Sequence, residues 1–322
     1  MGNILITSVG KRVSLVRAFE KEIKKISDGS KVFVSDAMPL LSAACNYFEN
    51  SFLLPKVSDP LYLDAIIKNC RKNNIKLIIP TIDTELLLLS KNKYLLLENN
   101  IFTAVSSENF IQVCRNKRKI HSFFKNRNIQ VAKEFSRKEL SYPLYIKPVD
   151  GSRSQNNFVV KNKDELLKKY IENHDYMFLE YIDDSMYQEY TCDLYYGRDS
   201  NLKCVVPRKR IDVRDGEVNK GKTEKNVLID FIKQKLGKIE GARGCLTAQF
   251  FLNKKSDNII GIEINPRFGG GFPLSYLAGA NYPFWLIKEY LLNEKIEPFM
   301  EWKNNLLMLR YDSEVLVEES EQ

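Results

Sequence analysis

Short apolar segments alternate with amphipathic ones along the N-terminal third of the chain, and this alternation restricts the folds that the chain can adopt. Residues 3–9, 31–36, 77–83 and 102–107 have the composition of buried strands, and helical patterns lie between them. Strands that alternate with helices are typical of a parallel sheet with helices on both faces. We therefore predict an α/β chain whose N-terminal domain is Rossmann-like.

The turn after the first predicted strand argues against a dinucleotide-binding domain. Residues 8–12 read Ser-Val-Gly-Lys-Arg, whereas the Rossmann fingerprint is Gly-x-Gly-x-x-Gly. Lys11, Asp83 and Glu85 follow predicted strands, at the edge where open α/β sheets place their ligands. We expect Asp83 to cap a helix, and contact of these three residues with a substrate is the alternative.

Polar and charged side chains interrupt the apolar pattern at residues 261–271 (GIEINPRFGGG). Because side chains alternate along a strand, Glu263, Asn265 and Arg267 should project from one face. Carboxylate and amide oxygens suit Mg²⁺, which proteins hold with one or two groups and the phosphates of a substrate. An arginine fork binds phosphate or carboxylate. The alternative is a strand that ends in a solvated glutamate and a Pro-Gly turn.

These eleven residues resemble the metal-binding strand of the ATP-grasp ligases, most closely the single ATP-grasp unit of carbamoyl-phosphate synthetase large subunits and their shorter relatives. The resemblance spans nearly the whole chain and implies three parts. Residues 1–113 would form the Rossmann-like pre-ATP-grasp domain, whose loops help to form the acceptor-substrate site. Residues 114–180 would form a small mobile lid, and residues 181–322 a lobe with the metal and substrate sites. The last two parts would make a two-lobed α+β ATP-grasp fold.

The predicted metal site gains a third ligand from the preceding strand. Residues 246–252 (LTAQFFL) carry one polar side chain that points among apolar ones, and a hairpin at residues 254–258 joins them to the strand of Glu263. Simple antiparallel pairing sets Gln249 beside Glu263. The resemblance then implies Gln249, Glu263 and Asn265 as the metal-contacting set. Gln at this place is the pattern of the carbamoyl-phosphate synthetase branch, since other branches have an acid there.

Two lysines are predicted to contact the nucleotide. Lys147 is the one charged residue in an apolar strand at residues 143–149, and a buried lysine needs an anionic partner. The resemblance makes Lys147 the second ATP lysine of the family and places Lys117 at the α-phosphate. A surface position on a basic helix is the alternative for Lys117.

A Gly/Ser-rich turn at residues 150–155 lies where the family has its mobile phosphate-covering loop. Backbone N–H groups and hydroxyls in such a turn can point at phosphate oxygens. The turn lacks the second glycine of the family loop, and Arg153 would compensate for it by adding positive charge. The expected contacts with ATP are Gly151, Ser152, Arg153 and Ser154.

The resemblance also implies where adenine and ribose bind. The backbone of residues 180–182 would hydrogen-bond the adenine edge, which makes Glu180, Tyr181 and Ile182 binding residues. Glu189 matches the acid that holds the ribose, and an ordinary exposed strand acid is its alternative.

Three basic residues join Arg267 as candidates to neutralise the transferred phosphate or to hold an acidic substrate. They are Arg208, Arg210 and Lys220, and a solvated hairpin explains them equally well. We predict Arg267, Lys220 and Arg210 as the catalytic group.

The composition excludes several kinds of site. The chain has 322 residues, of which 44% are apolar and 28% charged, as in an ordinary globular protein. Its six cysteines include no Cys-x-x-Cys pair, and its two histidines cannot form a multi-histidine metal site. We therefore expect neither disulfides nor a thiolate zinc site, and a reducing cytoplasm is the expected location. No apolar run reaches membrane-spanning length, so we expect no membrane partner.

The net charge of +8 raises the question of nucleic acid as a partner. Basic residues gather at residues 114–127 and 203–225, without base-stacking aromatics in a recognisable module. A nucleotide-phosphate pocket explains them at least as well as a solvated face. We expect no nucleic-acid partner.

The resemblance implies an enzyme of the EC 6.3 kind, which forms a carbon–nitrogen bond. ATP and Mg²⁺, with Mn²⁺ as a substitute, would convert a small-molecule carboxylate to an acyl phosphate that an amine or ammonia attacks, releasing ADP and phosphate. One alternative is a kinase-like phosphotransferase of the same fold. Another is a non-catalytic nucleotide-binding subunit, although such a subunit need not keep metal ligands. A homodimer is compatible with this reading.

Overall fold

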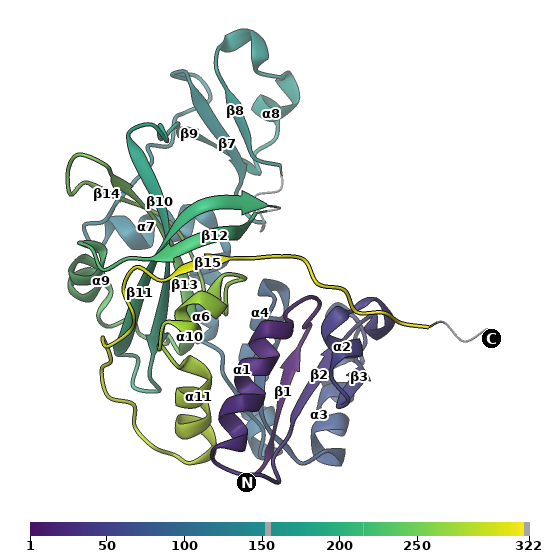
Figure 1. Cartoon of the computed structure of the whole chain (residues 1–322). Coiled ribbons are helices and arrows are strands. Elements are labelled where there is room, and N and C mark those ends of the chain that lie inside the picture. Colours follow the sequence, from purple (N-terminus) through teal and green to yellow (C-terminus); the bar gives the residue numbers. More distant parts are fainter. Residues whose placement is uncertain (152–155, 215, 319–322) are drawn as a thin grey trace.

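A computed structural model of the chain describes residues 1–151, 156–214 and 216–318 (Figure 1). It contains a five-stranded, a seven-stranded and a three-stranded sheet. The five-stranded sheet belongs to the N-terminal domain, and the three-stranded sheet projects from the opposite end of the molecule (Figure 1). The seven-stranded sheet lies between them.

The N-terminal sheet is parallel throughout, as the alternation of strands and helices predicted. Its strand order is β3-β2-β1-β4-β5. The strands are β1 (Asn3–Thr7), β2 (Val32–Asp36), β3 (Ser51–Leu53), β4 (Ile75–Pro80) and β5 (Phe102–Thr103). The predicted strands at 77–83 and 102–107 end earlier than expected, since a helix begins at Asp83 and Ser107 already caps the next one.

Helices cover both faces of this sheet because neighbouring residues of a strand point to opposite sides. Ile4 and Ile6 pack with the apolar face of α1, whereas Leu5 packs with α3 and α4. The helices of this domain are α1 (Val13–Lys24), α2 (Ala43–Tyr47), α3 (Tyr62–Lys72), α4 (Asp83–Lys91) and α5 (Lys93–Glu98), with a short 3₁₀ turn at Pro39–Leu41. Their packing leaves the carboxyl ends of β1, β2 and β4 open to the rest of the molecule.

The seven-stranded sheet carries the predicted metal strand. Its order is β15-β12-β11-β10-β13-β14-β6. The strands are β6 (Gln130–Val131), β10 (Tyr187–Tyr196), β11 (Leu202–Arg214), β12 (Glu217–Thr223), β13 (Gly244–Asn253), β14 (Ile259–Asn265) and β15 (Leu307–Leu309). Its pairs are antiparallel except that of β6 with β14. The helices that follow in this part are α9 (Leu228–Leu236), α10 (Phe272–Leu277) and α11 (Tyr282–Leu291).

The segment between the two large sheets divides its contacts. Helices α6 (Glu108–Arg115) and α7 (Lys117–Lys125) pack on β14, as does β6. The three-stranded sheet consists of β7 (Leu144–Pro148), β8 (Phe158–Val160) and β9 (Tyr176–Glu180), and α8 (Lys168–Glu172) lies beside it. Residues 114–180 therefore contribute to both sheets. The boundaries at residues 113 and 180 stay predictions.

Two further expectations concern the chain as a whole. All six cysteines are buried free thiols, as their scattered positions predicted. Among the described residues, no helix is both long enough and apolar enough to cross a lipid bilayer.

Candidate active site

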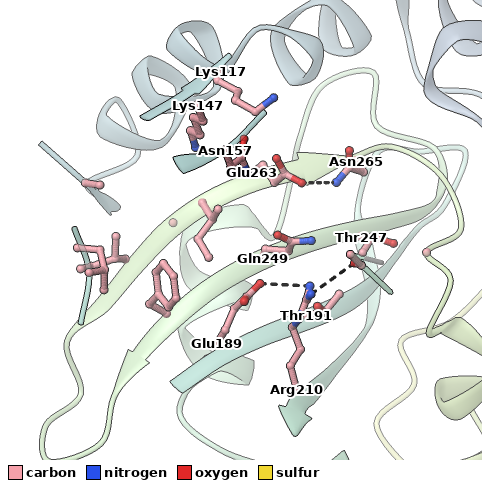
Figure 2. A pocket seen from close by; sticks show the side chains of 18 of the residues that line it. Lys117, Lys147, Asn157, Glu189, Thr191, Arg210, Thr247, Gln249, Glu263 and Asn265 are labelled. Atoms are coloured by element: carbon pink, nitrogen blue, oxygen red, sulfur yellow. Dashed lines mark hydrogen bonds and ion pairs between the residues drawn. The ribbon is translucent and has the colours of Figure 1, made fainter. Parts of the chain in front are cut away.

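A cavity of about 290 Å³ lies between the three-stranded sheet and one face of the seven-stranded sheet. Figure 2 shows side chains of β10, β11, β13 and β14 on its floor and two lysines, Lys117 and Lys147, facing them. The cavity is lined by most of the predicted site residues: Lys117, Lys147, Gly151, Glu180, Tyr181, Ile182, Glu189, Arg210, Gln249, Glu263, Asn265 and Arg267. The fold thus brings together residues that are spread over half the sequence.

The predicted metal ligands lie side by side. Gln249 pairs directly with Glu263 across β13 and β14, as antiparallel pairing predicted. The side-chain amide of Asn265 donates to Glu263 Oε1 at 2.9 Å, which turns the carboxylate toward the cavity (Figure 2). One carboxylate and two amides are hard oxygen donors that suit Mg²⁺, and substrate phosphates would complete its shell. The set has a single acid, and among the described residues no group of three or more His, Cys, Asp or Glu could hold a metal ion.

The two lysines form a buried positive end of the cavity. Lys147 is 5% exposed and Lys117 is 8% exposed, and the Lys117 ammonium donates to the carbonyl of Gly151 at 2.8 Å. Burial lowers the pKa of Lys147 to about 8; nearby Glu263 raises it and nearby Lys117 lowers it further. Two adjacent buried cations are costly unless an anion joins them. A nucleotide phosphate has the required charge.

A histidine that the sequence analysis did not single out lies beside these lysines. His121 lines the cavity from α7, one helical turn after Lys117. Burial, and then the charges of Lys147, Lys125 and Lys117, lower its pKa to about 3. His121 is therefore a neutral donor or acceptor near the expected phosphates. Its spacing of four residues from Lys117 is the sequence signal that could have found it.

Nucleotide binding should weaken with rising pH because of Lys147. Below pH 8 the free protein already carries the charged lysine, so binding needs no proton there. Above that pH the lysine must take up a proton on binding, and the Kd for MgADP should rise toward roughly tenfold per pH unit. Calorimetric titrations between about pH 7.5 and 9.5 measure this rise.

The variant Lys147→Met is the control for this pH dependence. It should bind MgADP more weakly at pH 7.5 and lose the rise above pH 8. A wild-type Kd that stays constant across the range would contradict the assignment of Lys147 to the phosphates.

The end of β9 lies at the side of the cavity where adenine is predicted. The N–H of Glu180 donates to the Lys133 carbonyl at 2.8 Å, and its carboxylate accepts from the Lys133 N–H at 3.0 Å. The Glu180 N–H is thus already bonded. The predicted adenine contact falls on the Glu180 carbonyl and on the backbone of Ile182.

Glu189 and Arg210 form an ion pair on neighbouring strands. Arg210 Nη1 lies 3.2 Å from Glu189 Oε1 (Figure 2). Burial raises the pKa of Glu189, while Arg210 lowers it and Glu263 raises it. Both side chains line the cavity, so Glu189 is no ordinary exposed strand acid. Arg210 holds in place Glu189, the acid that is predicted to bind the ribose. The catalytic role of Arg210 stays a prediction.

One predicted residue lies away from the site, and three others are outside the described residues. Lys220 is exposed on β12, opposite Leu309 of β15, and does not line the cavity. Ser152, Arg153 and Ser154 lie outside the described residues.

Arg267 connects the metal strand to the N-terminal domain. Its Nη2 and Nε donate to the two carboxylate oxygens of Asp83 at 2.7 and 3.1 Å. The expectation that Asp83 caps a helix is wrong, because α4 begins at Asp83 itself and Ile82 is its N-cap. The carboxylate of Asp83 instead fixes the Arg267 fork at the edge of the cavity.

The other two residues near strand ends have different surroundings. Glu85 is fully buried, where it accepts from Tyr62 at 2.6 Å and from Thr7 at 2.7 Å, and burial raises its pKa to about 7. It therefore belongs to the interior of the N-terminal domain. Lys11 lies 3.4 Å from Glu217 of β12.

Arg208 is buried, which excludes a solvated hairpin for this residue. It is 1% exposed and makes a two-pronged pair with Asp193, at 2.7 Å from Nε and 3.0 Å from Nη2. Asp193 also accepts from the hydroxyl of Ser275 at 2.5 Å. Arg208 lines the cavity, and its Nη1 has no partner among the described residues.

The three glycines after the metal strand make this arrangement possible. A Cβ atom on Gly269 would lie 2.9 Å from Thr247, one on Gly270 would lie 2.6 Å from Glu217, and one on Gly271 would lie 2.2 Å from Arg208. Side chains at these positions would displace the groups that line the cavity. The three glycines therefore form more than a turn, because their lack of side chains allows the neighbouring groups to pack closely against the backbone.

Two family models match parts of the sequence. The model for the PylC-like N-terminal domain matches residues 4–104. The model described as ATP-grasp in the biosynthetic pathway with Ter operon matches residues 172–311, which include both strands of the predicted metal ligands. Residues 172–311 therefore have the sequence of an ATP-grasp domain. No curated protein sequence matches this chain.

Solved structures share its fold at low identity. Biotin carboxylase from Campylobacter jejuni, in complex with β-γ-ATP, matches with a TM-score of 0.69 and 17% identity, over 95% of this chain and 74% of that one. The N5-carboxyaminoimidazole synthetase from Staphylococcus aureus, complexed with ADP, matches with a TM-score of 0.67 and 17% identity, over 96% and 80%.

The L-amino acid ligase from Bacillus licheniformis matches with a TM-score of 0.67 and 16% identity, over 92% of this chain and 75% of that one. These likenesses establish the predicted fold class, a parallel N-terminal sheet followed by an ATP-grasp fold.

Proposed function

We propose that this protein is an ATP- and Mg²⁺-dependent ligase that joins a small-molecule carboxylate to an amine or ammonia. The observation that carries the proposal is the meeting of Gln249, Glu263 and Asn265 with the buried Lys147 in one cavity. Oxygen donors opposite a buried cation suit a magnesium-bound polyphosphate better than any uncharged ligand. The solved relatives named with β-γ-ATP and ADP support the same choice of nucleotide.

The residues of the site have separate tasks in this proposal. Gln249, Glu263 and Asn265 hold Mg²⁺, which when bound neutralises the charge of the phosphates. Lys117 and Lys147 bind the phosphates from the other side, and His121 adds a neutral hydrogen-bonding group. Glu189 holds the ribose. Phosphoryl transfer needs positioning and charge neutralisation more than covalent help from the protein.

The chemistry proposed is transfer of the γ-phosphoryl group to a carboxylate oxygen. The acyl phosphate is then attacked by the amine nitrogen, the carbon–oxygen bond breaks, and inorganic phosphate leaves with that oxygen. Arg267 lies at the cavity edge, where its guanidinium can face the transferred group while Asp83 holds it. Gln249 is the feature that favours the carbamoyl-phosphate synthetase branch within the superfamily.

Product analysis tests this proposal. ADP and phosphate should appear together, and only when a carboxylate substrate from a library screen is present. Hydroxylamine should replace the amine and give a hydroxamate, because a good nucleophile intercepts an acyl phosphate. ¹⁸O in the carboxylate should appear in the released phosphate, since that oxygen attacks the γ-phosphorus.

Other product patterns would decide against the ligase. AMP and pyrophosphate would show adenylation instead of an acyl phosphate. A stable phosphorylated product would show a kinase-like phosphotransferase. Binding of MgADP without turnover of any substrate in the library would favour a nucleotide-binding subunit.

A further inference from the structure

A second, smaller cavity of about 80 Å³ adjoins the nucleotide cavity, between the N-terminal domain and the seven-stranded sheet. Its walls come from the turn after β1, the start of α1, β12 and the segment after β15. Arg12, Glu217, Gly269 and Gly270 line both cavities, so the two lie side by side. We call this smaller cavity the recess.

Cations outnumber anions around the recess. Among the described residues that line the recess, Lys11, Arg12 and Arg310 are cations and Glu217 is the one carboxylate. The guanidinium of Arg12 donates to the carbonyls of Phe268 and Thr81, both at 3.3 Å. Glu217 Oε2 lies 3.4 Å from the Lys11 ammonium and 3.3 Å from Arg310 Nη1. Burial raises the pKa of Glu217, and Lys11, Arg12 and Arg310 together lower it by more, so its pKa lies below the ordinary value. Arg208 and Arg267, which line the neighbouring nucleotide cavity, are already paired with Asp193 and Asp83.

The start of α1 adds to the positive potential. The helix is twelve residues long, has no acid in its first turn, and its N-cap residue Arg12 makes no side-chain capping bond. Ser14 of the first turn lines the recess. Unpaired N–H groups at a helix start favour an anion, so the backbone and the side chains act in the same direction.

The recess also opens away from the nucleotide. It shares Ser8, Gly10 and Ile82 with a cavity of about 720 Å³ at the carboxyl ends of the N-terminal strands. There the fully buried hydroxyl oxygen of Ser35 has no partner among the described residues. A molecule with its charged group in the recess therefore has a larger cavity beside it for its remaining atoms.

We propose that the recess binds an anionic group, a carboxylate or a phosphate, of one of the two small-molecule substrates, as a group that does not itself react. This inference rests on the proposed ligase function, and it narrows the substrate class to molecules with a second, anionic group. Lys11 and Arg310 attract that group, and their ion pairs with Glu217 hold the two cations beside it.

Anion titrations of the protein saturated with Mg²⁺ and a non-hydrolysable ATP analogue test the proposal, since the analogue fills the phosphate positions of the main cavity. Inorganic phosphate and acetate are the probes, and the shift in Tm measures their binding. At least one of them should stabilise the wild type with saturation. A larger effect of phosphate points to a phosphate-bearing substrate, and a larger effect of acetate points to a second carboxylate.

Charge variants assign the effect to the recess. Lys11→Gln and Arg310→Gln should each weaken the effective anion roughly fivefold or more, because each removes a charge-assisted hydrogen bond. Glu217→Gln should strengthen binding, since it removes the opposing charge, and a purely structural role would not give this sign. Lys21→Gln, an exposed cation in the last turn of α1, is the matched control and should change nothing.

Two results would overturn the inference. One is a wild type that neither anion stabilises, and the other is stabilisation that persists in the Lys11→Gln/Arg310→Gln double variant. The Tm shift caused by the nucleotide alone is recorded first. Its absence would count against the proposed function, while the same anion series on the nucleotide-free variants would still test the recess.

Discussion

Glu263→Gln should abolish most turnover and leave a folded protein. Glutamine has nearly the same shape, and its amide oxygen can still accept the hydrogen bond that Asn265 donates at 2.9 Å. The variant removes the single negative charge from the proposed ligands Gln249, Glu263 and Asn265, so the metal is held more weakly. We expect kcat to fall roughly 100-fold or more, by analogy with the loss of other groups that stabilise transition-state charge.

Two measurements separate this effect from a loss of folding. The first measurement is the rate of ADP release with the substrate pair found by the library screen. The second is the affinity of the ADP complex for Mn²⁺, measured by electron paramagnetic resonance, which needs no turnover. The matched control is Glu240→Gln, an exposed acid outside the cavity, which should keep wild-type rates. If Glu263→Gln retains full activity and Mn²⁺ affinity, the metal assignment fails.

Asp193→Ala should destabilise the C-terminal lobe by about 3–5 kcal/mol, because it leaves a buried guanidinium without its counter-charge. Both partners of the pair are almost fully buried, at 1% exposure for Arg208 and 0% for Asp193. The substitution also removes the acceptor for Ser275. The free energy of unfolding from urea titrations measures the cost.

The double variant Asp193→Ala/Arg208→Met isolates the cause. It removes the unpaired charge together with its partner, so part of the lost stability should return. Glu172→Ala breaks an exposed pair with Lys168 on α8 and should cost less than about 1 kcal/mol. Equal losses in the single and double variants would show that packing, rather than the buried charge, sets the stability here.

Local patterns in the sequence determined the architecture and the floor of the site. Alternation of strands and helices predicted the parallel N-terminal sheet, since burial on both faces demands it. A hairpin of known length predicted that Gln249 lies beside Glu263, and the structure confirms that placement. A lone charge in the apolar strand of Lys147 predicted a buried lysine, which is 5% exposed. Each of these inferences needs only neighbours in the sequence.

The tertiary structure alone decided which charges are paired. Asp83 and Arg267 are 184 residues apart, and no periodicity connects them, so Asp83 was misread as a helix cap. Arg208 and Lys220 are equivalent as basic residues of a hairpin, yet packing buries Arg208 against Asp193 and leaves Lys220 exposed. The close packing of Glu217 against Gly270 is likewise a contact between segments that are distant in the sequence. Contacts between distant segments depend on how the sheets pack, and the pattern of side chains along one strand does not predict this packing.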